Sequence, residues 1–105
     1  MQIQINYGDI DGSDAIQTRV HNQLNRELQY LADRVTRVEV HLRDDNAGKA
    51  GSNDKRAVME ARPAGAKPIT VNHAGEDIYK VIDETAGKLG RAVKKHFDKA
   101  AHEAR

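Results

Sequence analysis

The side chains best suited to chemistry in this 105-residue chain are basic residues near its C-terminus. They recur at steps of mostly three and four residues: Lys88, Arg91, Lys94, Lys95 and Lys99. On a helix, at about 100° per residue, this spacing places them on one face, opposite an apolar stripe. Such a face can contact successive phosphates of a nucleic acid without reading its bases. Taken alone, the pattern fits a merely solvated, lysine-rich helix equally well.

Patterns that support catalysis are missing from the sequence. There is no cysteine, no glycine-rich phosphate loop and no nucleophile turn around a serine. Ser13 is expected to cap a helix, and Ser52 to lie in a loop. The carboxylates of Asp9, Asp11 and Asp14 are close in sequence but lack the spacing of a calcium loop. We therefore expect no enzyme, with no catalytic residue, no metal and no cofactor.

The charges are unevenly distributed although they nearly cancel. The formal net charge is +1, with charged residues making up 31% of the chain. Acidic residues concentrate before position 85 and basic residues after it, and a surface polarised in this way can bind a polyanion. The N-terminus lacks the basic and apolar regions of a signal peptide, and no apolar run approaches the roughly 20 residues that cross a bilayer. These features favour the cytoplasm, without membrane or small-molecule partners.

Alternating and helical apolar patterns predict the elements that must position the basic residues. Alternation predicts strands, and steps of three and four residues predict helices. The expected strands span about 2–7, 37–44, 55–62 and 69–73, and the expected helices about 14–32 and 76–101. A stretch rich in Asn, Asp, Gly and Ser, about 45–54, is expected to be a flexible loop. Gly87 and Gly90 lie inside the second helix, either as close-packing positions or as tolerated losses.

This order predicts an α+β fold in one domain spanning 1–105. Four strands form one sheet, and both helices cover its apolar face, because that arrangement buries every apolar stripe in two layers. The other sheet face stays polar and wet. The helix–three strands–helix portion resembles a double-stranded RNA-binding domain with one extra leading strand. No aromatic residue falls in the middle of a strand on the outward face, so base stacking on the sheet is not expected.

The C-terminal segment resembles a known family. Asp77-x-Tyr79-x-x-Ile82-Asp83, followed by Lys88-Leu89-x-Arg91 and Lys95-His96, is similar to the final helix of the bacterial ribosome hibernation-promoting factor and ribosome-associated inhibitor family. This family is also called the sigma-54 modulation protein family. The opening Ile-x-Ile strand and the strand around residues 38–42 extend the resemblance over the whole chain.

The resemblance implies a β-α-β-β-β-α domain that binds the small ribosomal subunit. It implies occupation of the mRNA and tRNA channel, so that translation is inhibited by steric blocking during stationary phase or stress. It also implies the short form of the family, without a C-terminal dimerisation domain. By position, the residues expected to contact rRNA are Lys88, Arg91, Lys94, Lys95 and Lys99, with Lys55 and Arg56 at the start of the third strand and Arg26 on the first helix.

Two other functions remain open at this point. The chain can be a general binder of structured RNA without a ribosomal role, because phosphate contacts carry no sequence information. It can also be a protein-interaction domain whose basic face docks an acidic partner.

Overall fold

The computed structural model describes residues 1–45 and 54–103, which form one four-stranded sheet and two long helices. The expected flexible loop, about 45–54, lies almost entirely outside the described residues. The elements follow the predicted order: β1 (Gln2–Tyr7), α1 (Asp14–Leu28), a 3₁₀ turn η1 (Gln29–Leu31), β2 (Val35–Asp44), β3 (Lys55–Pro63), β4 (Ile69–Gly75) and α2 (Ile78–Glu103). The predicted α+β fold is therefore confirmed.

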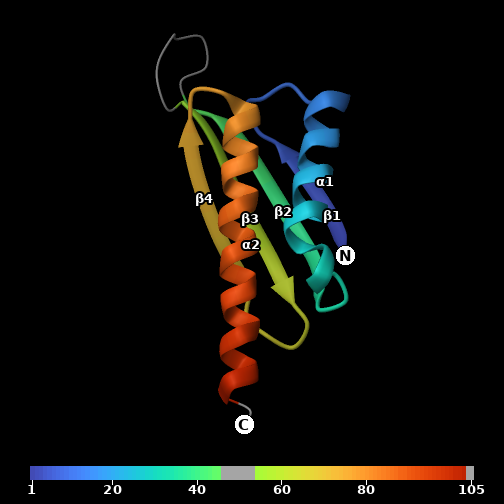
Figure 1. Ribbon diagram of the computed structural model, residues 1–105. Coiled ribbons are helices and arrows are strands. Elements are labelled where there is room, and N and C mark those ends of the chain that lie inside the picture. Colours follow the sequence, from blue (N-terminus) through green and yellow to red (C-terminus); the bar gives the residue numbers. More distant parts are fainter. Residues whose placement is uncertain (46–53, 104–105) are drawn as a thin grey trace.

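The strands lie in the sheet in their chain order, β1-β2-β3-β4. β1 runs parallel to β2, because α1 carries the chain back across the sheet between them, and the other two pairs are antiparallel. Figure 1 shows both helices in front of the sheet, with α1 towards β1 and α2 towards β4. The C-terminal turns of α2 extend past the ends of the strands.

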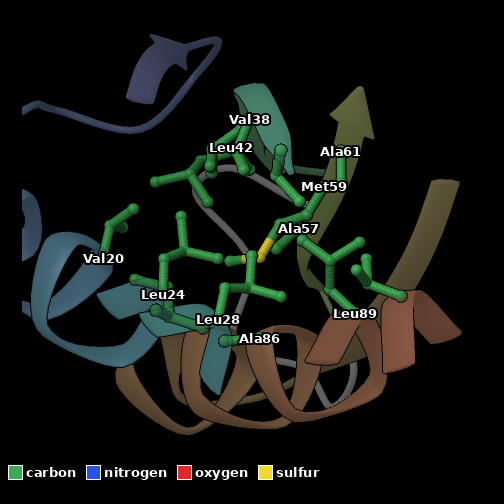
Figure 2. Close-up of a cluster of buried hydrophobic side chains, with 14 of the residues drawn as sticks. Val20, Leu24, Leu28, Val38, Leu42, Ala57, Met59, Ala61, Ala86 and Leu89 are labelled. Atoms are coloured by element: carbon green, nitrogen blue, oxygen red, sulfur yellow. The ribbon is translucent and has the colours of Figure 1, made fainter. Parts of the chain in front are cut away.

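The core lies between the sheet and the two helices, as the alternating patterns predict (Figure 2). The helix-facing side chains of β3 are Ala57, Met59 and Ala61, all fully buried. Alanines at two of these positions leave room for Leu24 and Leu89 to approach the sheet from the two helices. The opposite face of the sheet carries the alternate, mostly polar residues, and neither α1 nor α2 covers it (Figure 1).

Helix α1 begins where predicted and ends earlier. The Ser13 hydroxyl accepts a hydrogen bond from the Ile16 N–H at 3.1 Å, which is the expected N-cap. The predicted end near residue 32 is wrong for the α-helix, because the last turn tightens into the 3₁₀ turn at Gln29. This turn still buries Leu31, so the apolar stripe continues although the helix type changes.

Helix α2 begins at Ile78, two residues later than predicted, because Asp77 caps it. The Asp77 carboxylate accepts a hydrogen bond from the Tyr79 N–H at 2.9 Å. The two glycines inside the helix differ in their surroundings. A Cβ on Gly90 would lie 3.0 Å from the Glu27 Cβ of α1, so Gly90 allows the helices to pack closely. A Cβ on Gly87 would approach only the end of the Arg91 side chain, so this glycine is a tolerated loss.

Candidate nucleic-acid interface

Helix α2 separates its apolar and basic residues onto two faces. Its inner face buries Ile82, Leu89 and Val93 against the sheet. On its outer face, over the C-terminal half, four cations line one shallow groove with Asp98 and His102. We call this surface the basic groove. Its cations are Arg91, Lys94, Lys95 and Lys99. The structure thus brings together four of the five helix residues predicted to contact rRNA.

Lys94 and Asp98 form an ion pair within the groove. Lys94 Nζ lies 3.0 Å from the Asp98 carboxylate, one helical turn away. The hydrogen bond that Lys94 donates to Asp98, together with the charge of that carboxylate, raises the pKa of Lys94, so this amine stays protonated at neutral pH. Both side chains are exposed by more than half, and exposed ion pairs are weak because water screens them. A phosphate can therefore replace Asp98 as the partner of Lys94.

A second depression lies beside the basic groove, on the side of α2 that faces η1. It is lined by residues of both helical segments, including Tyr30, Arg34, Lys94 and Phe97. The Arg34 guanidinium stacks over the Phe97 ring, with its carbon 5.4 Å from the ring centre. Tyr30 is 61% exposed, more than any other large apolar or aromatic side chain of the described residues. An exposed aromatic ring beside cations can stack on an unpaired base.

Sequence reasoning missed Tyr30 and Arg34 as candidate site residues. They follow the end of α1 and have no periodic relation to the basic residues of α2. Only the side-by-side packing of the two helices brings them next to Lys94. The only sequence signal was an aromatic residue at the edge of an otherwise regular helical stripe.

Lys88, the fifth predicted helix residue, lies outside the groove. It is exposed one turn before Arg91, but its Nζ donates a hydrogen bond to the main-chain carbonyl of Asn72 on β4, at 3.1 Å. This contact joins α2 to the edge of the sheet. Lys88 therefore has a structural partner in the described residues, whereas its predicted role in RNA binding remains a prediction.

Lys55 and Arg56 lie at the far end of the sheet from the groove and are held by acidic residues. Lys55 Nζ lies 2.6 Å from the Asp54 carboxylate and 3.2 Å from that of Asp44. The hydrogen bond from Lys55 lowers the pKa of Asp54, and the same bond raises the pKa of Lys55. Arg56 lies on the open face, 3.4 Å from the Asp45 carboxylate, and it also donates to Asn72 Oδ1 at 3.0 Å.

Two arginines of α1 have different surroundings: Arg26 was predicted to contact rRNA, and Arg19 joins α1 to α2. Arg26 is exposed in the last turn of α1 and does not line the basic groove. Arg19 makes a bidentate contact with Asp83 of α2, at 2.7 and 2.5 Å. Asp83 raises the pKa of Arg19 through this hydrogen bond and its charge. Arg19 also lies over the ring of Tyr79, 5.9 Å from its centre.

The arrangement offers cationic groups that can bind phosphates. Among residues 1–45 and 54–103, no group of three or more His, Asp or Glu side chains is placed to hold a metal ion. No helix in this part of the chain is long and apolar enough to cross a membrane. Four projecting cations with flexible stems suit the irregular phosphate spacing of a folded RNA.

Comparison with known proteins identifies the family and the fold of this chain. The sequence model of the family described as sigma 54 modulation protein / S30EA ribosomal protein matches residues 3–101. The chain belongs to this family. One relative is the ribosome hibernation promoting factor of Azotobacter vinelandii. Its sequence is 28% identical to this chain over 99 residues, which cover 94% of this chain and 85% of the relative.

Two solved structures share the fold of this family member. A ribosomal subunit interface protein from Coxiella burnetii superposes with a TM-score of 0.75 at 20% identity, covering 93% of this chain and 99% of the other. The N-terminal domain of Thermus thermophilus Protein Y superposes with a TM-score of 0.74 at 26% identity, covering 91% and 99%.

The motif that carried the sequence resemblance has a structural explanation in this family member. Asp77 caps α2, Ile82 is buried in the core, and Asp83 ties α2 to α1 through Arg19. These residues fix where α2 begins and how it packs. The basic groove starts two turns later, and the second part of the motif supplies two of its cations, Arg91 and Lys95.

Proposed function

We propose that this protein is a ribosome-associated translation inhibitor that binds the rRNA of the small subunit in the mRNA and tRNA channel. The observation that carries the proposal is the basic groove on α2, in a chain of this family. The names of its relatives, a hibernation promoting factor and a subunit interface protein, support a ribosomal partner. Inhibition follows from occupancy, because a bound domain excludes mRNA and tRNA from the same space. No catalytic group is needed.

The shape of the molecule supports binding in a channel between RNA walls. Its principal extents are 53 × 23 × 19 Å, so it is an elongated rod. The C-terminal turns of α2 project past the sheet at one end of this rod (Figure 1). Cations on a projecting helix reach phosphates that a flat surface cannot approach. Tyr30 and Arg34, beside Lys94, extend the proposed contact area towards α1.

The test is co-sedimentation with purified small ribosomal subunits at low and at moderate salt. We expect the wild type to co-sediment at low salt and the double variant Arg91→Glu/Lys95→Glu to remain in the supernatant. A matched control, Lys67→Glu/Lys80→Glu, makes the same change in net charge at exposed positions outside the groove. Equal loss of binding in both variants would show that only net charge matters and would contradict a specific site.

A general binder of structured RNA is the second candidate, because the groove contacts phosphates and offers no base-reading geometry. Competition separates the two functions. Unrelated duplex RNA that displaces the protein from small subunits at equal phosphate concentration favours the general binder. Displacement only by small subunits supports the ribosomal role. Pull-downs that survive nuclease treatment would instead favour an acidic protein partner.

A further inference from the structure

The two edges of the sheet differ in how they are protected. Edge strands expose unpaired N–H and C=O groups, and proteins usually shield them with charges, prolines or bulges. β4 follows Pro68, receives a hydrogen bond from Lys88 on its Asn72 carbonyl and contacts α2 through His73 and Glu84. β1, at the opposite edge (Figure 1), consists of Gln2–Tyr7 and carries no charged side chain. Its pairing with β2 is regular along its whole length.

The hydrogen bonds of β1 show which of its main-chain groups point outward. The Gly8 N–H donates to the Leu42 carbonyl of β2 at 2.9 Å, continuing the ladder between the two strands. Along a strand, main-chain groups point alternately to the two sides. Residues two, four and six positions before Gly8 therefore also face β2. The N–H and C=O groups of Ile3, Ile5 and Tyr7 face the free edge.

The sequence of β1 is symmetric about Gln4. Reading outward in both directions, Gln4 is flanked first by Ile3 and Ile5, then by the amides Gln2 and Asn6. If two copies of β1 pair antiparallel about a two-fold axis at Gln4, Ile3 faces Ile5 of the second copy. Both residues point their main-chain groups to the free edge, so each such pair exchanges two hydrogen bonds. The two Gln4 residues then face each other on the axis as a non-hydrogen-bonded pair.

The two faces of this paired strand also match. Ile3, Ile5 and Tyr7 lie on the helix side, where they pack against the core yet stay only half-buried. A second copy would cover their exposed portions with the same residues. On the open face, the amide side chains of the two β1 strands would form an uncharged ladder. An antiparallel self-pairing therefore satisfies hydrogen bonds, apolar contacts and charge in a single register.

We propose that β1 is a homodimerisation edge through which two copies form one continuous sheet. This interface is isologous, since the same strand contributes to both sides. It goes beyond the proposed function and does not depend on RNA binding. Helix α2 packs on β3 and β4, away from this edge, so both basic grooves remain exposed in the dimer.

The test is sedimentation velocity of the full chain, without RNA, over a wide range of concentrations. We expect a monomer–dimer equilibrium for the wild type. Gln4→Glu places two carboxylates on the axis and should weaken association at least about fivefold. Within one copy, the new carboxylate can still accept the hydrogen bond that Arg37 now gives to Gln4, so the fold is retained. An equimolar mixture of Gln4→Glu and Gln4→Lys should restore the dimer through an opposite-charge pair.

A single cysteine gives an independent readout, because the chain has none of its own. Opposite residues in a non-hydrogen-bonded antiparallel pair have Cα atoms about 4.5 Å apart, within the range of a disulfide. Gln4→Cys should therefore form a covalent dimer under mild oxidation, whereas Thr70→Cys on the β4 edge should not. A wild type that stays monomeric at all concentrations, or equal cross-linking of both variants, would overturn the proposal. If the wild type stays monomeric, the β1 edge does not pair with a second copy, and a strand of another protein becomes the alternative partner.

Discussion

Neutralising two cations of the basic groove should change the salt dependence of binding by a calculable amount. The change is Arg91→Gln/Lys95→Gln, and the ligand is the purified small ribosomal subunit. Each phosphate contact contributes about −0.9 to the slope of log affinity against log salt on a duplex. Four groove cations then give a slope of about −3.6, and the double variant should have about −1.8. At 0.1 M salt the loss of two contacts corresponds to an affinity about 60-fold weaker.

The fold should tolerate this change, because both side chains project into solvent from the outer face of α2. We expect the free energy of unfolding, measured in urea, to stay within about 0.5 kcal/mol of the wild type. Affinity is measured by filter binding or fluorescence anisotropy at several salt concentrations. The slope, rather than the affinity at one salt concentration, is the deciding quantity.

Two control variants determine how the result is interpreted. Lys67→Gln/Lys80→Gln removes the same net charge outside the groove and should leave the slope unchanged. Asp98→Asn removes the carboxylate that pairs with Lys94 and should tighten binding several-fold at low salt. An unchanged slope for Arg91→Gln/Lys95→Gln would refute the phosphate contacts. Equal slope changes in both double variants would refute the groove as a distinct site.

Three further predictions test the packing, the charges and the neighbouring depression. Gly90→Ala should destabilise the fold in urea, because its Cβ would lie 3.0 Å from a side chain of α1, whereas Gly87→Ala should be neutral or stabilise it by up to about 1 kcal/mol. Lys55 lowers the pKa of Asp54 below the usual 3.8, so the ionised carboxylate stabilises the fold above that pH and this stabilisation is lost as the pH falls through the folded-state pKa. Asp54→Asn should therefore reduce the fall in melting temperature at acidic pH, as followed by circular dichroism. Tyr30→Ala should weaken binding to small subunits about fivefold or more without altering the salt slope, because stacking releases no counterions. An altered slope would show that the tyrosine supports a cation instead of a base.

The fold could be predicted from the sequence because each element buries a continuous stripe. Val38, Val40 and Leu42 alternate along β2, and α2 repeats its apolar residues at helical steps, so neither can be shifted without exposing the core. The boundaries were less predictable, because capping and turns decide them. Helix α2 starts two residues later than predicted because the Asp77 side chain caps it with one hydrogen bond. The spacing of apolar residues gives no sign of such a bond.

The candidate site was predictable only within one helix. The spacing of Arg91, Lys94 and Lys95 placed them together, because a helix has a fixed geometry. Spacing alone could not show whether Lys55 and Arg56 lie near these residues. The structure places both beside acidic residues elsewhere on the sheet. Conversely, tertiary packing alone brings Tyr30 and Arg34 to Lys94.

The N-terminal half of α2 stabilises the fold, and its C-terminal half carries the proposed binding site. The N-terminal half is anchored by its cap at Asp77 and by the contact between Asp83 and Arg19. The C-terminal half carries the basic groove and projects beyond the strands (Figure 1). Like charges one helical turn apart, Arg91 with Lys95 and Lys95 with Lys99, oppose the helix that presents them, so the anchored half has to supply stability. Variants of the anchor should therefore lose binding only together with structure, whereas variants of the groove should lose binding alone. If Asp83→Asn weakened binding to small subunits while thermal stability stayed unchanged, this division within α2 would be wrong.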